Sequence, residues 1–139
     1  MGLLIDSTAC IHAERLRQTP EDFVESVLEQ WGDVDLGISV MSAGELFHGC
    51  WRADTPARRA RREEFIAALL SAIPVLPITV TIARVFGEVD ARLSAKGERL
   101  PTSDLLIAAT ALSRGDAVVT GNARHFARVP RLKVYRLRP

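Results

Sequence analysis

The sequence contains few cysteines, and they form no recognisable pattern. Cys10 and Cys50 are the only two in 139 residues, and no C-x-x-C spacing occurs. A disulfide framework needs more cysteines and a cysteine zinc site needs paired ones, so neither is expected. Two isolated cysteines suit a reducing compartment, and we expect a cytoplasmic protein.

Neither sign of charge dominates the sequence. Eighteen basic residues face seventeen acidic ones, for a formal net charge of +1. Overall charge therefore favours no nucleic-acid partner, and any electrostatic binding surface has to be local. Hydrophobic residues make up 47% of the chain, whereas disordered chains are poorer in them. The length predicts a single domain over residues 1–139.

The chain also lacks a secretion signal and an uninterrupted membrane-spanning run. Its start has no positive region and too short an apolar segment for a signal peptide. Residues 66–83 carry no charge and are almost long enough to span a bilayer. Because Pro74 and Pro77 would break a helix there, we expect a helix end, a strand and a helix start, with no membrane contact.

Apolar strands alternate with amphipathic helices along the sequence. Helix starts are expected at Thr19-Pro20, Ser42, Thr55-Pro56 and Thr102-Ser103-Asp104. Strands are expected at residues 3–5, 37–40, 75–79, 117–120 and 133–137. Because the strands are continuous apolar runs, they predict an α/β fold around a mostly parallel sheet of four to five strands.

Polar side chains stand where the expected strands end. Asp6 directly follows the first strand, Glu45 lies in the turn after the second, and Asp104 opens the helix that leads into the fourth. Thr120 and Asn122 follow the fourth strand. Ligands of an open parallel sheet bind outside the carboxyl ends of its strands, so we expect these groups to converge there.

Each of these residues also has an ordinary structural explanation. Asp6 or Ser7 can cap a helix, Ser42-x-x-Glu45 has the spacing of a capping box, and Asp104 suits a helix N-terminus. Asn122 suits a turn. As a set they favour a metal site, because carboxylates without a basic neighbour repel one another unless a cation neutralises them. Hard oxygen ligands suit Mg²⁺ or Mn²⁺, which can activate water and stabilise charge on a phosphoryl oxygen.

Four stretches, LLIDSTACI, SAGEL, SDLLIAATAL and VVTGNARHF, resemble in order and spacing the motifs of PIN domains. The likeness is closest to the VapC toxins of bacterial toxin–antitoxin pairs, and it covers the whole chain. It implies a three-layer α/β/α sandwich and a metal-dependent endoribonuclease that hydrolyses RNA phosphodiester bonds. It also implies a VapB-type antitoxin as partner, and with it we expect a homodimer.

The resemblance assigns roles to particular residues by motif match. The catalytic and metal-binding acids fall on Asp6, Glu45 and Asp104. The residues expected to contact substrate or support the acids are Ser7, Thr120 and Asn122. Many PIN domains have a fourth aspartate at the position of Asn122, so its uncharged amide argues against a firmly bound second metal.

Two basic segments leave an RNA-binding role open. The first holds Arg58, Arg59, Arg61 and Arg62, next to two glutamates. A phosphate-binding surface and a solvated helix face are both consistent with it. The second holds Arg128, Arg131, Lys133, Arg136 and Arg138, where RNA contact and a polar edge strand have equal weight. The nearby Arg124 and His125 are expected to be exposed loop residues.

The sequence has more large apolar side chains than a small core readily buries. They lie on the helices that carry Phe23, Val27, Trp31, Phe47 and Trp51. We expect their exposed remainder to receive an amphipathic helix of the antitoxin, with a basic side chain of the antitoxin among the acids.

Other functions fit the sequence less well. A phosphoacceptor signalling domain needs an aspartate at the end of the third strand, where Thr79 stands, and a lysine after a later strand, whereas Lys96 falls on a helix. A haloacid-type phosphatase needs Asp-x-Asp, and Thr8 occupies the second position. A housekeeping or DNA-directed PIN nuclease and a non-catalytic PIN-like binding domain stay open as alternatives.

Overall fold

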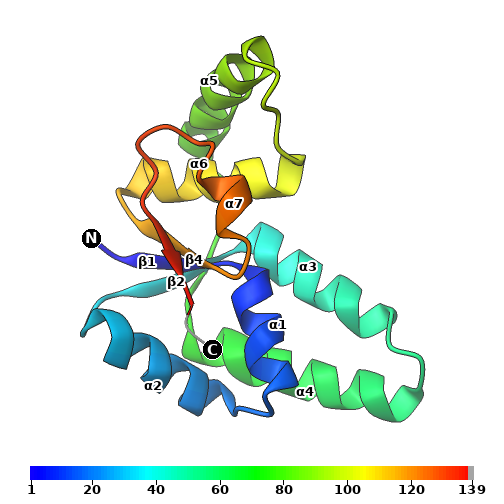
Figure 1. The fold of residues 1–139 in the computed structure, drawn as a ribbon. Helices are drawn as coiled ribbons and strands as arrows, with labels where there is room; N and C mark the ends of the chain where they lie inside the picture. Colours follow the sequence, from blue (N-terminus) through cyan, green and yellow to red (C-terminus); the bar gives the residue numbers. More distant parts are fainter. Residues whose placement is uncertain (138–139) are drawn as a thin grey trace.

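The computed structural model describes residues 1–137 and has one five-stranded sheet at its centre (Figure 1). The strands are Leu3–Ile5 (β1), Leu36–Ser39 (β2), Val75–Leu76 (β3), Ala117–Thr120 (β4) and Val134–Arg136 (β5). Their spatial order is β3-β2-β1-β4-β5, and every pairing is parallel. The α/β fold with a parallel sheet is therefore confirmed.

Helices cover both faces of the sheet. They are Ser7–Arg15 (α1), Pro20–Trp31 (α2), Val40–Trp51 (α3), Pro56–Ala72 (α4), Val80–Ala95 (α5), Thr102–Arg114 (α6) and Ala123–Phe126 (α7). In Figure 1, α5, α6 and α7 lie above the sheet, and α1 to α4 lie below it. The result is the three-layer α/β/α sandwich expected from the resemblance.

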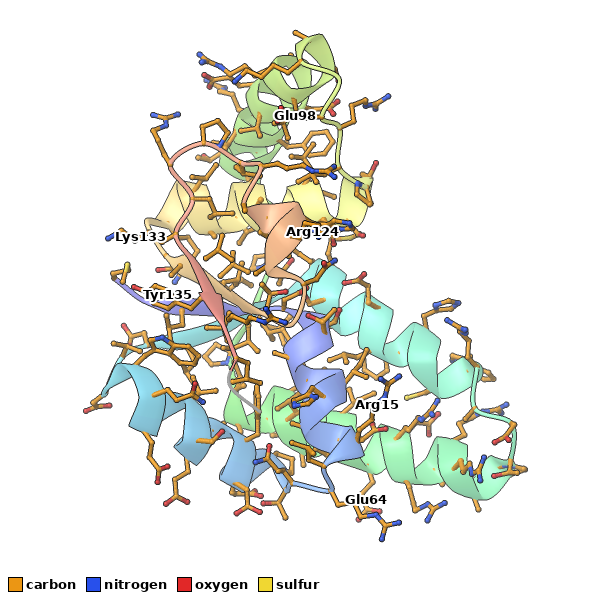
Figure 2. All side chains as sticks on the ribbon, viewed as in Figure 1. Arg15, Glu64, Glu98, Arg124, Lys133 and Tyr135 are labelled. Atoms are coloured by element: carbon orange, nitrogen blue, oxygen red, sulfur yellow. The ribbon has the colours of Figure 1, made fainter. Side chains whose placement is uncertain are left out.

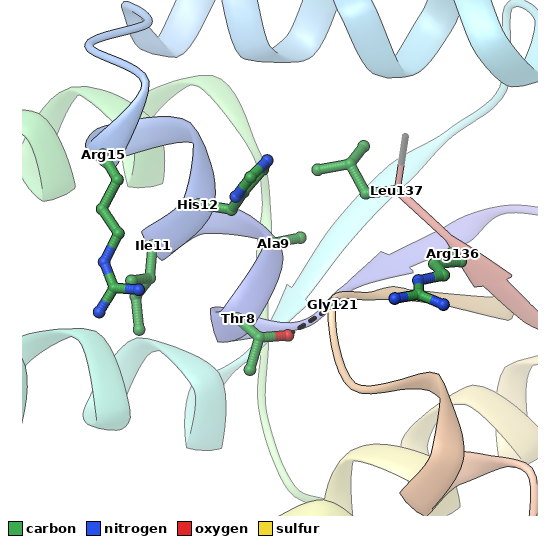
Figure 3. A pocket seen from close by; sticks show the side chains of 8 residues that line it. All are labelled: Thr8, Ala9, Ile11, His12, Arg15, Gly121, Arg136 and Leu137. Atoms are coloured by element: carbon green, nitrogen blue, oxygen red, sulfur yellow. Dashed lines mark hydrogen bonds between the residues drawn. The ribbon is translucent and has the colours of Figure 1, made fainter. Parts of the chain in front are cut away.

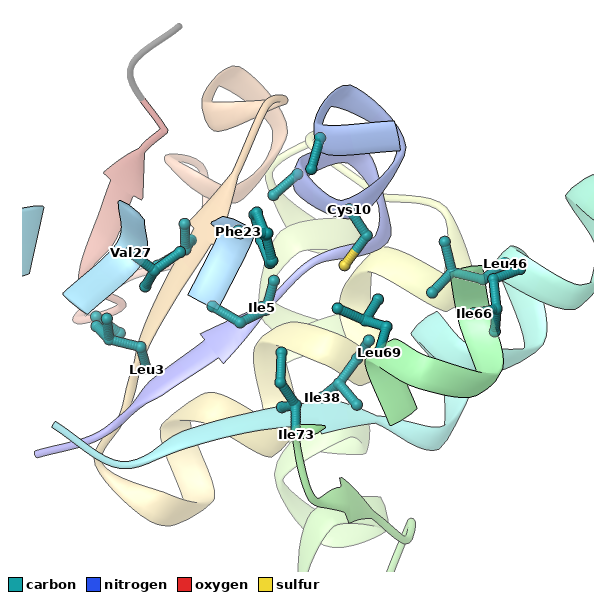
Figure 4. Packing of buried hydrophobic residues seen from close by; sticks show 14 of the residues in the cluster. Leu3, Ile5, Cys10, Phe23, Val27, Ile38, Leu46, Ile66, Leu69 and Ile73 are labelled. Atoms are coloured by element: carbon teal, nitrogen blue, oxygen red, sulfur yellow. The ribbon is translucent and has the colours of Figure 1, made fainter. Parts of the chain in front are cut away.

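Alternate residues of the central strands supply two separate cores, because successive side chains of a strand point to opposite faces. Leu3, Ile5 and Val119 pack with helices α1 to α4 (Figure 4). Leu4 and Val118 pack with α5, α6 and α7. Since both faces are covered, the strands must be apolar throughout, which explains their continuous hydrophobic runs.

Three of the four predicted helix starts are confirmed, and the one at Ser42 is wrong. Thr19 and Thr55 cap α2 and α4 through their side chains. Helix α3, expected to open at Ser42, begins earlier at Val40, because the Ser39 hydroxyl accepts the Met41 N–H at 3.1 Å. Helix α6 begins at Thr102, but the cap position belongs to the preceding proline and no side chain caps it.

The third strand is shorter than predicted. It ends at Leu76, immediately before Pro77, which has no N–H to donate to a sheet ladder. Residues 66–83 otherwise divide as expected, into the end of α4, β3 and the start of α5. No helix within residues 1–137 is long and apolar enough to cross a membrane.

Strand β5 forms one edge of the sheet and is anchored by an aromatic pair. Trp31 of α2 stacks on Tyr135, with ring centroids 5.6 Å apart and planes within 7°. Figure 2 shows Tyr135 and Lys133 along this edge and Arg124 on α7 above it. The expected fifth strand is therefore present over Val134–Arg136, and of the basic C-terminal residues Arg136 lies in it, whereas Arg138 lies outside the described residues.

Candidate active site

Asp6 lies at the carboxyl end of the central strand β1 and is almost completely buried. It occupies the position that precedes α1, yet its side chain makes no capping hydrogen bond to that helix, and only 2% of the residue is exposed. Helix capping therefore does not explain this aspartate. Its carboxylate points instead toward the ends of the neighbouring elements.

Two hydroxyl groups hold the Asp6 carboxylate from either side. Thr8 Oγ1 donates to Oδ2 at 2.7 Å, and Thr120 Oγ1 donates to the same oxygen at 2.8 Å. Each hydroxyl in turn accepts a backbone N–H of the segment after β4, from Gly121 at 2.9 Å and Asn122 at 2.8 Å respectively. Such chains polarise one another, so the loop after β4 is fixed to the acid that ends β1.

Glu45 reaches the same edge from α3. Because α3 starts at Val40, Glu45 lies in its second turn and cannot form the capping box that the sequence spacing suggested. Its Oε1 accepts the Ser7 hydroxyl at 3.0 Å. Ser7 thus joins the second acid to the segment that carries Asp6.

Asp104 stands in the first turn of α6 and is bound by a histidine. His125 Nδ1 lies 2.9 Å from Asp104 Oδ2, and the Asp104 side chain is 16% exposed. The Asn122 amide nitrogen is also 2.9 Å from the same ring nitrogen. Asp104 and Asn122 therefore both contact the same ring nitrogen of His125.

Burial and mutual repulsion make this site unfavourable for negative charge. Burial raises the pKa of Asp6, the Thr8 and Thr120 hydroxyls oppose that rise, and the charge of Asp104 adds to it. Burial likewise raises the pKa of Glu45, with Ser7 opposing and with both other acids adding repulsion. The three carboxylates therefore interact with one another, and no lysine or arginine within residues 1–137 forms an ion pair with any of them.

The donor set fits a hard divalent cation that retains water. Within the described part of the chain, no group of three or more His, Cys, Asp or Glu side chains is already arranged as a metal site. Mg²⁺ commonly binds through only one or two carboxylates and keeps several waters, so three converged direct ligands are not required. The observation that matches such an ion is a set of carboxylates that repel one another and offer only oxygen atoms as ligands.

The sequence interpretation missed two residues at this site. Thr8 was considered only as an argument against a phosphatase, and His125 only as an exposed loop residue, yet they contact Asp6 and Asp104. Their spacing gave a weak signal, since Thr8 follows Asp6 by two residues and His125 follows Asn122 by three.

The arginine run on α4 is largely occupied within the protein. Arg58 pairs with Asp54 at 2.8 Å, Arg62 lies 3.5 Å from Glu14, and Arg59 stacks over Trp51 with 4.6 Å to the ring centroid. These contacts favour a structural role for the run over a phosphate-binding one.

A parallel α/β/α domain with coupled carboxylates at its carboxyl edge defines an acidic centre suited to phosphoryl chemistry. The PIN-domain family matches residues 3–132. Among characterised relatives, the tRNA(fMet)-specific endonuclease VapC of Shigella flexneri is 33% identical over 133 residues, which cover 96% of each chain. The chain therefore belongs to the PIN-domain family and, within it, to the VapC ribonucleases.

Solved structures agree with this assignment. The structure of VapBC2 from Rickettsia felis bound to a DNA fragment from their promoter superposes with a TM-score of 0.85 at 21% identity, over 99% of this chain and 100% of the other. DNA-bound VapBC from Salmonella typhimurium gives a TM-score of 0.80 at 27% identity, over 99% of both chains. The chain is thus a VapC-type endoribonuclease in fold and family.

Proposed function

We propose that this chain is the toxin of a toxin–antitoxin pair, a cytoplasmic endoribonuclease that hydrolyses RNA with Mg²⁺ held by Asp6, Glu45 and Asp104. Mn²⁺ is the alternative ion. The single observation that carries the proposal is the set of three mutually repelling carboxylates at the end of β1, in the second turn of α3 and in the first turn of α6, without a lysine or arginine partner within residues 1–137. A cation would relieve the repulsion that the protein itself leaves uncompensated.

The side chains around the acids hold them in place. A bound divalent ion supplies an activated water and stabilises charge on the phosphoryl oxygens. The Thr8 and Thr120 hydroxyls orient the Asp6 carboxylate, and Ser7 orients Glu45. His125 fixes one oxygen of Asp104. Supporting groups of this kind commonly change metal affinity or activity 10- to 100-fold.

The substrate class follows from the relatives. The Shigella flexneri protein is named for cleavage of tRNA(fMet), which supports a structured RNA as substrate here. Recognition of single-stranded loops is the usual route to sequence selection in RNA. We therefore propose an RNA loop as the cleaved element, within an RNA that the family assignment alone does not specify.

The partner follows from the solved complexes. VapBC-5 from Mycobacterium tuberculosis is a member of the VapBC family of toxin-antitoxin systems, which supports a VapB-type antitoxin as the partner of this chain. We propose a homodimer of the toxin as well. Of the large apolar residues expected to remain exposed, Phe23 and Val27 are wholly buried, whereas Phe47 and Trp51 on α3 are 46% and 69% exposed. The face of α3 with Phe47 and Trp51 is the better candidate for binding an amphipathic helix.

Metal removal tests the nuclease directly. Purified, antitoxin-free protein should cleave a labelled RNA in Mg²⁺ or Mn²⁺, stop in excess EDTA, and recover when Mg²⁺ is restored. Ca²⁺ serves as the control for a purely structural effect of a divalent ion. Cleavage at full rate in excess EDTA would overturn the metal-dependent mechanism.

Expression separates the toxin from a housekeeping nuclease. The intact chain should arrest growth when expressed alone and be harmless when expressed with its upstream neighbour, and Glu45→Ala should restore growth without that neighbour. Harmless expression of a soluble, RNA-cleaving chain, with no partner recovered from its native host, would favour the housekeeping alternative.

A further inference from the structure

Two cavities lie beside the candidate active site, and they share the lining residues Ile11 and Arg15 of α1. The larger, about 660 Å³, lies between α1 and β5 and is called here the α1–β5 groove (Figure 3). Its lining includes Thr8, Ile11, His12, Arg15, Gly121 and Arg136. The smaller, about 320 Å³, is lined by Glu45 and again by Ile11 and Arg15. A continuous ligand could therefore extend from Glu45 past Arg15 into the groove.

The groove carries basic side chains that the protein leaves unpaired. His12 and Arg15 project from α1, and Arg136 comes from β5; in Figure 3 His12 lies on the side of α1 toward Arg136, and Arg15 lies on the other side of the helix. Among residues 1–137, neither guanidinium forms a hydrogen bond or an ion pair. Glu14, beside Arg15 in sequence, is bound to Arg62 instead. Free guanidinium groups facing a common cavity suit the planar, bidentate binding of phosphate.

The groove is joined to the catalytic acid by one side chain. Thr8 lines it, donates to Asp6 at 2.7 Å and accepts the Gly121 N–H at 2.9 Å. A ligand against Thr8 therefore lies next to the Asp6 carboxylate. Ile11 is 37% exposed at the junction with the smaller cavity, where it offers an apolar contact to a ribose or a base.

We propose that the α1–β5 groove seats the RNA strand beside the cleaved phosphodiester, with Arg15 and Arg136 binding backbone phosphates. The inference rests on the proposed ribonuclease function and deepens it by naming residues that bind substrate. Contacts of this kind fix the position of the strand and carry no base specificity. The groove also gives the basic C-terminal strand a role, since Arg136 belongs to that segment.

Binding of single-stranded RNA in EDTA tests the groove without cleavage. The probe is a labelled oligoribonucleotide, followed by fluorescence anisotropy from low to moderate salt. Arg15→Ala and Arg136→Ala should each weaken binding about tenfold at low salt and reduce the slope of log K against log salt by about 0.7. Arg15→Lys and Arg136→Lys should keep the slope and lose only part of the affinity, because they keep the charge but not the bidentate geometry.

The matched control is Arg84→Ala, which removes the same charge from an exposed position on α5, on the other face of the sheet. It should leave both affinity and slope unchanged. In Mg²⁺, the groove variants should raise KM about tenfold and change kcat less than about threefold, and circular dichroism should confirm that they fold.

Three outcomes separate the two proposals. If Arg15→Ala and Arg136→Ala bind RNA as the Arg84→Ala control does, the groove is not the RNA seat, even where the unmodified enzyme cleaves normally. If they lose antitoxin binding but keep RNA affinity, the groove is a protein-binding surface and the inference is overturned. If the unmodified chain binds RNA through the groove but never cleaves it with any metal, the proposed nuclease fails while the groove stands.

Discussion

Aspartates lie at both ends of the sheet, and the two ends treat them oppositely. At the amino end, Asp116 accepts the Gly2 N–H at 3.0 Å and pairs with Arg114 at 2.9 Å. At the carboxyl end, Asp6 is more deeply buried, accepts the hydroxyls of Thr8 and Thr120, and is repelled by the charge of Asp104. The charge of Asp116 is therefore neutralised by Arg114, whereas Asp6 has no lysine or arginine partner within residues 1–137.

The difference shows how a functional acid is distinguished from a structural one. A buried charge that the fold needs is paired and hydrogen-bonded, because an unpaired one costs several kcal/mol. A charge that stays uncompensated at the ligand-binding edge of a parallel sheet is a candidate for function. Asp116 and Asp6 provide that contrast within one sheet, so isosteric amide substitutions at both positions test it directly.

The largest expected effect is on catalysis. Asp6→Asn and Asp104→Asn should each lower RNA cleavage by more than about 100-fold, since even outer-shell partners of a metal site commonly cost 10- to 100-fold. Asp116→Asn, the matched control, should retain near-normal cleavage because its carboxylate binds only Gly2 and Arg114. Initial rates at saturating Mg²⁺ measure all three. An equal loss of cleavage in Asp6→Asn and Asp116→Asn would mean that the two aspartates do not differ in function.

A smaller loss is expected when the support for Asp6 is removed. Thr120→Val keeps the side-chain shape but deletes the donor to Asp6 and the acceptor of the Asn122 N–H. Cleavage should fall about 10- to 100-fold, and more Mg²⁺ should be needed for half-maximal rate. Thr110→Val is the control, because its buried hydroxyl bonds only to the Leu106 carbonyl of its own helix. Unaltered metal dependence in Thr120→Val would place Thr120 outside the site.

The sequence predicted the fold and only part of the candidate site. Apolar runs and proline-marked helix starts predicted the fold, because burial on both faces and helix capping are local consequences of residue type. The positions of Asp6, Glu45 and Asp104 at one edge followed from parallel topology. The partners of these acids did not follow, since the contacts of Thr8 with Thr120 and of His125 with Asp104 join segments far apart in the chain.

The start of α3 shows a second limit of sequence reasoning. Two serines, Ser39 and Ser42, both precede acceptable helix residues, and the structure uses the first as the cap, through the bond of its hydroxyl with the Met41 N–H. That choice moves Glu45 by one turn and turns an apparent capping residue into a partner of Ser7. Capping signals fix that a helix starts nearby, but alternative caps within a few residues are decided by the surrounding core.

The next effect is on stability without metal. The raised pKa values of Asp6 and Glu45 mean that folding favours their protonated forms, so this contribution is present below their ordinary pKa values and is lost as pH rises through the raised ones. In EDTA, Asp6→Asn should therefore melt at least as high as the unmodified protein at pH 7, with an advantage that shrinks toward pH 4. Thermal melts across this range by circular dichroism measure it.

The control again comes from the other end of the sheet. Asp116→Asn loses its bond to Arg114, so at pH 7 it should be less stable by about 1 kcal/mol, or about 4 °C in Tm. With Mg²⁺ present, the unmodified protein should gain stability and Asp6→Asn should gain little. A fall in Tm for Asp6→Asn in EDTA equal to that of Asp116→Asn would assign both aspartates a structural role.

The smallest expected effect adds a charge to the acidic end. Asn122 lies beside His125, and its amide nitrogen contacts the same ring nitrogen that binds Asp104. Asn122→Asp would place a fourth carboxylate at this edge and replace a neutral amide with a hard anionic oxygen. Calorimetry with Mn²⁺ should then detect a second, weaker site or about tenfold tighter overall binding. Asn122→Ala should leave the stoichiometry unchanged, which separates added charge from the mere loss of the amide. Unchanged metal binding in Asn122→Asp would mean that His125 and Asp104 absorb the new charge, and that Asn122 lies outside the reach of the metal.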